Sequence, residues 1–264
     1  MLTLTVAVLQ TALVWQDSAA NRAQFEELFA QVRPADLIVL PEMFNSGFSM
    51  QANVFAESMS EATMQWLKQQ AARLDVAICG SLAIRLEAQS DGYSGIVNRF
   101  VFVQPSGEVD YYDKRHLFRM GQEHRHYQAG LARKIVQFRG VRWLLQVCYD
   151  LRFPVFSRNR GDYDAILYVA NWPQERSRIW STLLAARAIE NQAFVVGCNR
   201  VGQDGNQLSY SGDSVILDFV GLPLASTEPG TTGVLKAQLD LLQLQQFRQQ
   251  FPAALDADAF ELVE

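Results

Sequence analysis

The sequence predicts a mixed α/β fold, in which buried strands alternate with amphipathic helices. Residues 36–40 and 164–170 are short continuous apolar runs, which is typical of strands covered on both faces. Between such runs apolar residues recur at helical spacing, as at Phe25, Leu28 and Phe29. No linker or change of composition divides the 264 residues, so we expect one domain over residues 1–264, built on two central sheets or one large one.

Turn and cap residues divide the chain into its expected elements. Asp17 or Ser18 caps the first helix, and Pro34 ends it. The expected helices cover about residues 18–33, 60–74, 174–192 and 240–251, with a loop at residues 43–58 and irregular chain at 118–130. The expected strands cover residues 1–10, 36–40, 76–81, 98–104, 108–112, 134–138, 142–147, 164–170 and 193–198, followed by two closing strands.

The composition excludes several classes of protein. Hydrophobic residues make up 49% and charged residues 19%, as in ordinary globular proteins. The net charge of −5 and the scattered 23 Lys and Arg residues argue against a nucleic-acid partner. No apolar run approaches the ~20 residues that span a bilayer, and the first ten residues alternate like a strand rather than a signal peptide. Three widely spaced cysteines without a paired motif suit a reducing compartment, so we expect a cytoplasmic protein.

Three residues that can carry chemistry lie just past the ends of expected strands. They are Glu42, Lys114 and Cys148. Because the carboxyl ends of neighbouring strands meet at one edge of a sheet, we expect these side chains to come together there. A thiol needs a base to become a nucleophilic thiolate, and a tetrahedral oxyanion needs a fixed donor. Glu42 would be the base, Lys114 the oxyanion donor and Cys148 the nucleophile.

Each of these residues also has an ordinary structural interpretation. Most free cysteines behave as small buried hydrophobes, and Cys148 taken alone would be interpreted in this way. Glu42 and Lys114, taken singly, are solvated charges at the end of a strand or hairpin. Cys79 and Cys198 lie inside apolar strand runs, and we assign them to the core.

The residues around the three positions resemble the signatures of the nitrilase superfamily of carbon-nitrogen hydrolases. These are residues 40–42 (Leu-Pro-Glu), 112–117 (Tyr-Asp-Lys-Arg-His-Leu) and 147–154 (Val-Cys-Tyr-Asp-Leu-Arg-Phe-Pro), in this order. The resemblance extends to Glu123, which matches the second glutamate of the family, and to residues 187–192 in the long helix. One departure is the turn at residues 218–221, which lacks the proline common in the family.

The resemblance implies a fold and an assembly. The fold would be a four-layer α-β-β-α sandwich, and the protein an oligomer, expected to be a homodimer. Residues 253–264 carry apolar side chains without a helix to place them, so this tail is expected to pack on the partner subunit. No cofactor is implied. His116, His124 and His126 have no cysteine close in sequence, so we expect no metal.

The resemblance also implies a site and a reaction. Cys148 would form a thioester with an amide substrate, and Glu123 would help to position the water that hydrolyses it. The backbone N–H of Tyr149 would join Lys114 in holding the oxyanion. Asn171 and Trp172 are expected in the substrate-binding part of the site.

Two further runs, Phe118-Arg119-Met120 and residues 170–173 (Ala-Asn-Trp-Pro), are most similar to the ω-amidase branch. That branch hydrolyses the terminal amide of 2-oxoglutaramate and similar dicarboxylic acid monoamides. Deaminated-glutathione amidases and aliphatic amidases share the acid, lysine and thiol, and an acyltransferase would use them to pass the acyl group to an amine. A non-catalytic binding module would have lost them. The substrate carboxylate needs a cation or a set of donors. The candidates, which the sequence does not rank, are Arg119, Arg125, Arg152 and Arg176 and the backbone donors of the loops after Glu42 and Asn171.

Overall fold

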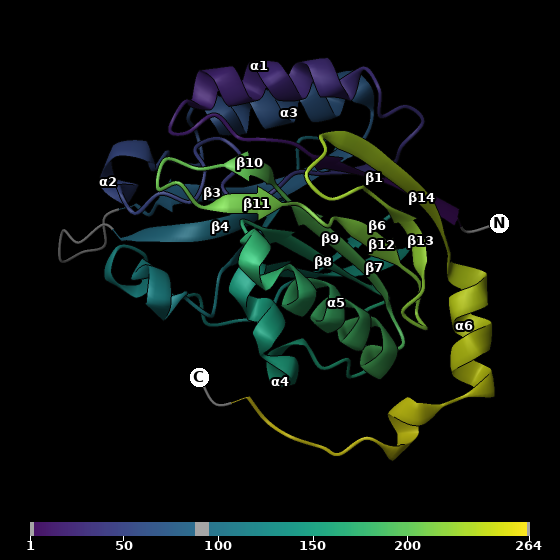
Figure 1. Cartoon of the computed structure of the whole chain (residues 1–264). Coiled ribbons are helices and arrows are strands. Elements are labelled where there is room, and N and C mark those ends of the chain that lie inside the picture. Colours follow the sequence, from purple (N-terminus) through teal and green to yellow (C-terminus); the bar gives the residue numbers. More distant parts are fainter. Residues whose placement is uncertain (1–2, 88–94, 263–264) are drawn as a thin grey trace.

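The computed structural model describes residues 3–87 and 95–262. Helices cover the outer faces of two sheets that pack against each other, so the layers follow the order α-β-β-α (Figure 1). The predicted four-layer sandwich is thus confirmed. The α-helices are α1 (Ser18–Phe29), α2 (Ala52–Phe55), α3 (Ala62–Leu74), α4 (Pro154–Ser157), α5 (Ser177–Asn191) and α6 (Leu241–Gln250).

Each sheet has six strands within the described residues. The first sheet has the order β14-β1-β2-β3-β4-β5, formed by Gly233–Asp240, Thr3–Gln10, Leu37–Val39, Ala77–Arg85, Ile96–Val103 and Val109–Asp113. The second sheet has the order β13-β12-β9-β8-β7-β6, formed by Pro223–Ser226, Val215–Leu217, Phe194–Asn199, Ala165–Ala170, Val141–Val147 and Ile135–Phe138. Strands β1 to β3 are parallel in one sheet and β7 to β9 in the other. A separate hairpin joins β10 (Val201–Gln203) and β11 (Ser209–Ser211).

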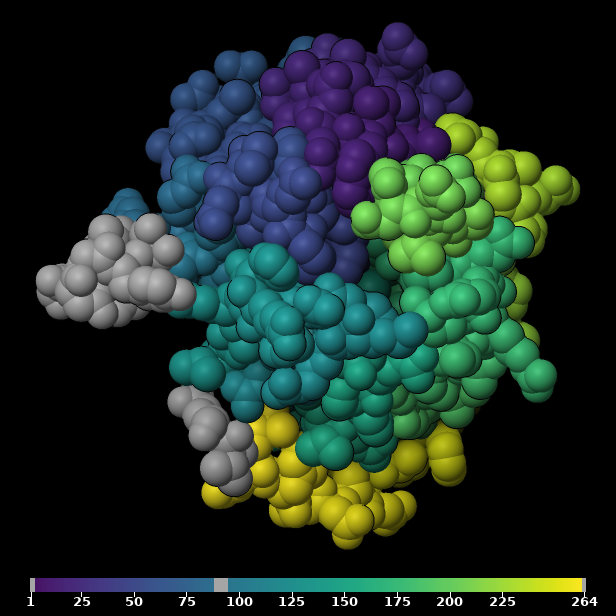
Figure 2. All heavy atoms as spheres, turned by 60° about the vertical axis from the view of Figure 1, so that its left-hand side comes forward, coloured from purple at the N-terminus to yellow at the C-terminus, as the bar shows by residue number. Residues whose placement is uncertain are grey.

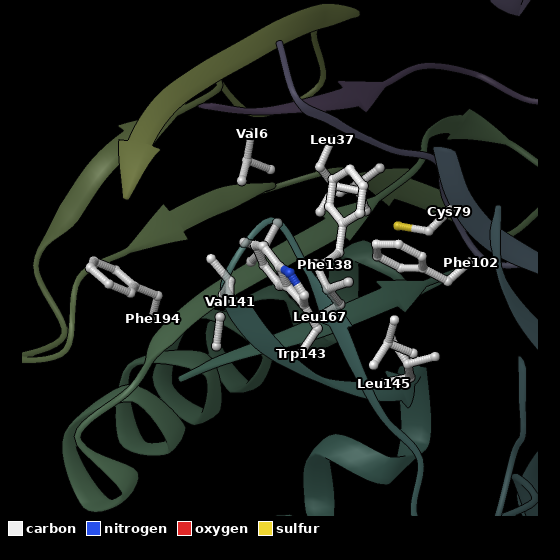
Figure 3. Packing of buried hydrophobic residues seen from close by; sticks show 14 of the residues in the cluster. Val6, Leu37, Cys79, Phe102, Phe138, Val141, Trp143, Leu145, Leu167 and Phe194 are labelled. Atoms are coloured by element: carbon white, nitrogen blue, oxygen red, sulfur yellow. The ribbon is translucent and has the colours of Figure 1, made fainter. Parts of the chain in front are cut away.

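Successive side chains along a strand point to opposite faces of its sheet, so the apolar residues form three layers: one between the sheets and one under the helices on each outer face. In β1, Val6 points into the core between the sheets, whereas Ala7 packs under α1 and α3. Figure 3 shows side chains of both sheets, among them Phe102 and Trp143, filling the space between them. On the far side, Trp180 of α5 packs on the second sheet. Since both faces of each sheet are covered, the central strands are apolar at almost every position.

Several expected boundaries differ from the structure. The first helix begins as expected, with Asp17 as its cap, but ends at Phe29 rather than at Pro34. The strand expected at residues 76–81 continues to Arg85, because its second half pairs with β4. Gly80 marks no turn: a Cβ there would lie 2.9 Å from the Phe44 ring, so glycine permits a close approach.

Short elements were missed. Residues 43–58 contain the single turn of α2, and the region after β9 holds five strands (β10 to β14) instead of two closing strands. Three of these five strands have only three residues and a fourth has four, which is too short for a period-2 pattern to be read.

The carboxyl-terminal tail lies along α4 and α5 of its own chain (Figure 1). The Arg160 guanidinium lies 4.6 Å from the centre of the Phe260 ring, and Leu262 packs against the core between the sheets. The described part of the tail is therefore placed by contacts within the chain, and a contact with a partner subunit stays a prediction.

None of the helices in residues 3–87 and 95–262 is long and apolar enough to cross a membrane.

Burial of two thiols between the sheets predicts a loss of stability in alkaline solution. Burial raises the pKa of Cys79 and of Cys198, and mutual repulsion of the thiolates adds to the effect at Cys79. The folded chain thus keeps these protons at a pH where the unfolded chain, with thiol pKa values near about 8.5, releases them. The free energy of unfolding should fall as the pH rises above about 8. Urea unfolding at about pH 7 and about pH 9.5 measures this fall, which should be smaller in the Cys79→Ala/Cys198→Ala variant; an equal fall in both proteins would contradict the prediction.

Candidate active site

Glu42, Lys114 and Cys148 meet, but not at the edge of one sheet. Glu42 follows β2 and Lys114 follows β5, which lie in the first sheet with β3 and β4 between them. Cys148 follows β7 in the second sheet. The expectation of neighbouring strands in a single sheet is therefore wrong. The residues come together because the two sheets pack face to face with the carboxyl ends of these strands at the same end of the sandwich.

A buried ammonium group lies between two carboxylates. Lys114 Nζ is 2.9 Å from Glu42 Oε1 and 3.0 Å from Glu123 Oε1. All three side chains are fully buried. A lysine ammonium has three N–H donors, so two bonds to carboxylates leave one donor for an acceptor in the pocket that Lys114 lines. A charge buried in this way is stable only when it is paired and hydrogen-bonded, as it is here.

Sequence reasoning missed the residues that hold the two carboxylates together. Asn98 Nδ2 donates to Glu42 Oε1 at 2.8 Å and to Glu123 Oε1 at 3.2 Å. Ser81 Oγ donates in turn to Asn98 Oδ1 at 2.8 Å and accepts the backbone N–H of Met43 at 2.9 Å. The available signal was the asparagine itself, a polar side chain in the buried strand β4 that must find buried partners.

The outer carboxylate oxygens are bound by backbone amides. Asn171 N–H donates to Glu42 Oε2 at 2.8 Å, and Phe118 N–H donates to Glu123 Oε2 at 2.6 Å. The Asn171 side chain also donates to the Glu42 carbonyl at 2.7 Å. Asn171, expected to contact substrate, thus orients Glu42 and lines the pocket as well.

Cys148 begins a 3-10 turn directly after β7. Its φ of 45° lies in the left-handed region, which a residue other than glycine seldom adopts. Such strain persists where the surroundings enforce it, often at functional sites. The residue is partly exposed and borders the same pocket as Lys114 and Tyr149. The strained turn therefore presents the thiol to the pocket rather than to the core.

The charges around the thiol oppose its ionisation at rest. Burial and the negative charge of Glu42 raise the pKa of Cys148, whereas Lys114 acts in the opposite sense. Burial alone would lower the pKa of Lys114, but Glu123 and Glu42 outweigh it and raise that pKa. Burial also raises the pKa of Glu123, against the attraction of Lys114. Two carboxylates and one ammonium carry a net charge of −1, so an added thiolate is unfavourable unless a carboxylate takes its proton.

The pocket above Cys148 has a cavity volume of about 130 Å³. In Figure 2 the surface is hollowed between blue, teal and light green segments, which contribute Met50, Phe118 and Leu208 to the pocket lining. Trp172, expected in the substrate-binding part, also lines it. The β10–β11 loop, which holds Leu208, is a wall that the sequence did not predict. A cavity of this size fits a small substrate.

Charged side chains in the lining are mostly positive. Lys114, Arg152 and Arg176 are cationic, and Asp204 is the one carboxylate among the described lining residues. Asp204 is held by its own loop, since its oxygens accept the Tyr210 hydroxyl at 2.9 Å and two backbone N–H groups. Of the other arginines considered from the sequence, Arg119 and Arg125 are exposed and lie outside this lining.

The three histidines do not form a cluster with other ligand residues. His116 Nδ1 lies 2.7 Å from Asp150 Oδ1, and its ring stacks on Phe153. Within residues 3–87 and 95–262 there is no group of three or more His, Cys, Asp or Glu side chains that could hold a metal ion.

Comparison with known proteins agrees with this fold. The model of the carbon-nitrogen hydrolase family matches residues 5–249, and the chain belongs to this family. It is 52% identical to the ω-amidase YafV of Yersinia enterocolitica, over the whole of both chains, and 32% identical to the 2-oxoglutaramate amidase of Bacillus subtilis, over 94% of this chain and 95% of that one. The crystal structure of XC1258 from Xanthomonas campestris, a CN-hydrolase superfamily protein, superposes with a TM-score of 0.95 at 46% identity and covers both chains fully.

Proposed function

We propose that this protein is an ω-amidase, which hydrolyses the terminal amide of small dicarboxylic acid monoamides such as 2-oxoglutaramate and releases ammonia. The observation that carries the proposal is the partly exposed Cys148 thiol beside the buried Glu42, Lys114 and Glu123, at a small pocket with three cationic side chains and one carboxylate. The relatives named above, an ω-amidase and a 2-oxoglutaramate amidase, support the same substrate class.

In the acylation step, Glu42 takes the proton of Cys148 while the sulfur attacks the amide carbon. This transfer keeps the net charge of the buried group at −1, which is why a carboxylate base suits a thiol with a raised pKa. The remaining N–H of Lys114 and the backbone N–H of Tyr149 stabilise the oxyanion. The C–N bond then breaks, and Glu42 passes the proton to the leaving nitrogen, which departs as ammonia.

In the deacylation step, water attacks the thioester. Glu42 takes a proton from the water and returns it to the sulfur as the S–C bond breaks, which releases the carboxylic acid. Glu123 shares Lys114 and Asn98 with Glu42, so it holds both in place without accepting the proton itself. No cofactor enters either step.

The pocket charges explain the preference for an anionic amide. A substrate carboxylate in a closed pocket must be paired, or the complex loses several kcal/mol to desolvation. Within residues 3–87 and 95–262 Arg152 forms no ion pair with a protein carboxylate, whereas Arg176 is paired with Glu175. The Arg152 guanidinium is held over the Trp172 ring, 5.2 Å from its centre. We assign the substrate carboxylate to Arg152, with Arg176 nearby.

Substrate selectivity tests this assignment. We expect 2-oxoglutaramate and succinamate to be cleaved with a far higher kcat/KM than butyramide, because a site that pairs a charge rejects a neutral analogue. Arg152→Gln should lower kcat/KM for succinamate roughly 10²-fold, which corresponds to the loss of a charge-assisted hydrogen bond. The same substitution should leave kcat/KM for butyramide nearly unchanged. Ammonia release measures both.

The exposed Arg119 provides a matched control, because Arg119→Gln removes the same charge outside the pocket lining. It should leave both substrates unaffected. Equal efficiency of the wild-type enzyme on anionic and neutral amides would instead indicate a general aliphatic amidase with the same catalytic residues. Transfer of the acyl group to added hydroxylamine in preference to water would indicate an acyltransferase.

We also propose that the enzyme is a cytoplasmic homodimer. Three free cysteines support a reducing location. Apolar side chains at the outer surface near α5, such as Ile189 and Leu222, support association of two copies. A monomeric mass by sedimentation equilibrium at micromolar concentration would exclude the dimer.

A further inference from the structure

Asp150 is a fully buried carboxylate two residues after the nucleophile. Its Oδ2 accepts the backbone N–H of Val147 and the hydroxyl of Tyr112, both at 2.9 Å. Its Oδ1 accepts the backbone N–H of His116 at 3.0 Å and lies 2.7 Å from His116 Nδ1. Because Tyr112 lies near the end of β5 and Val147 ends β7, this one side chain connects the two sheets at the ends that carry Lys114 and Cys148.

The bonds of Asp150 hold the chain on the nucleophile side and on the lysine side. Val147 directly precedes Cys148, so its N–H fixes where the strained turn begins. The Tyr112 hydroxyl also accepts the backbone N–H of Arg115 at 2.9 Å. The two residues that follow Lys114 are therefore anchored by their backbone amides, one directly to Asp150 and the other through Tyr112.

The ring of His116 makes this anchor rigid. It stacks on Phe153 with 3.8 Å between the ring centres and meets Phe156 edge-on. Phe153 and Phe156 follow Cys148 in the chain, so the loop after Lys114 is also packed on the segment after the nucleophile. The distance between the ammonium and the thiol is thus set by an interface between the sheets, with Asp150 at its centre.

We propose that Asp150 is a positioning residue for the amidase reaction, which sets the placement of Lys114 against Cys148 through Tyr112 and His116. It acts on the chemistry described above and so rests on the proposed function. Asp150 belongs to the nucleophile turn but lies outside the pocket lining, and it acts on the reacting atoms only through other residues. Misplacement of a reacting group by about 1 Å can cost roughly 10²-fold in rate, so this anchor determines kcat rather than substrate binding.

The test is the pair Asp150→Asn and Tyr112→Phe. In Asp150→Asn one oxygen becomes an NH₂ group, which then faces a backbone N–H of Val147 or of His116, so one anchor is lost in either orientation of the amide. We expect kcat for 2-oxoglutaramate to fall on the order of 10²-fold, while KM stays within about threefold. Tyr112→Phe keeps the packing but loses the hydroxyl, and kcat should fall about tenfold. In the double variant kcat should fall by less than the product of the two single decreases, because both changes break the same hydrogen bond between Tyr112 and Asp150.

Asp164 provides a matched structural control. Its carboxylate also accepts four hydrogen bonds, three from Arg142 and one from Arg248. It precedes β8, at the end of the second sheet opposite Cys148. Asp164→Asn should lower the urea midpoint as Asp150→Asn does, but kcat should stay at the wild-type value. If Asp150 had a merely structural role, Asp150→Asn would likewise lower the urea midpoint and leave kcat unchanged.

A second readout requires no substrate. Alkylation of Cys148 by iodoacetamide depends on Glu42 and Lys114 for thiolate formation, so it should slow at least about tenfold in Asp150→Asn and less in Tyr112→Phe. Wild-type kcat and wild-type alkylation rates in folded Asp150→Asn and Tyr112→Phe proteins would overturn the proposal. If the wild-type protein released no ammonia from any monoamide, the proposed function would fail, while the alkylation rates would still test the positioning role.

Discussion

Replacing Cys148 by alanine or serine is expected to abolish amide hydrolysis and to leave the fold intact. The substitution removes the sulfur that forms the covalent intermediate, so turnover should fall on the order of 10³-fold or more. Alanine and serine have the same steric restriction at positive φ as cysteine, so the strained turn at this position costs each of them a similar amount. Ammonia release from 2-oxoglutaramate, with circular dichroism of the same preparation, measures both parts of the prediction.

Cys79→Ala is the matched control, because Cys79 is a fully buried thiol in the core between the sheets, outside the pocket lining. It should lower stability by about 1 kcal/mol through the lost packing and leave kcat unchanged. Appreciable hydrolysis by a clean Cys148→Ala preparation would rule out the cysteine mechanism.

Glu42→Gln is expected to block acylation, whereas Glu123→Gln should slow turnover without preventing it. Both carboxylates contact Lys114 and Asn98, so each glutamine disturbs the same buried network by a similar amount. Of the two carboxylates, Glu42 acts more strongly than Glu123 on the pKa of the Cys148 thiol, through its negative charge. Loss of a general base typically lowers the rate about 10²- to 10⁴-fold. We expect this decrease in the acylation step of Glu42→Gln alone, so that this variant forms no acyl-enzyme.

Mass spectrometry of enzyme quenched during turnover distinguishes the two variants. Glu123→Gln should accumulate the acyl adduct on Cys148, and Glu42→Gln should remain unmodified. If Glu42→Gln forms the adduct at the wild-type rate, the base lies elsewhere, and the role of Glu42 is limited to holding Lys114.

Local patterns were sufficient to predict most of the fold. The strands β1, β2, β7, β8 and β9 were expected within a few residues of their ends, because strands buried on both faces are apolar throughout. The caps at Asp17 and Asp240 follow from carboxylates that accept backbone N–H groups at helix starts. The short strands from β10 to β13 were not predicted, since three or four residues carry too little periodicity.

Which strands lie in the same sheet could not be predicted from local patterns. The acid, the lysine and the thiol were placed on neighbouring strands of one sheet, but the thiol belongs to the other. The turn residues after a strand predict where that strand ends, and so which side chains lie at the catalytic end of the sheet. These local signals contain no information on which distant residues come together, such as Glu42 and Lys114, which are 72 residues apart.

The sequence by itself therefore determined the layered α/β architecture and, through family signatures, the residues proposed to act as base, oxyanion donor and nucleophile. The tertiary structure alone decided that Asn98 couples the two glutamates and that Asp150 ties the lysine loop to the nucleophile turn. It also decided that Arg152 and Arg176, but not Arg119 or Arg125, line the pocket. The physical reason is that periodicity and turn chemistry act over a few residues, whereas burial, charge pairing and pKa depend on which distant segments the two packed sheets bring into contact.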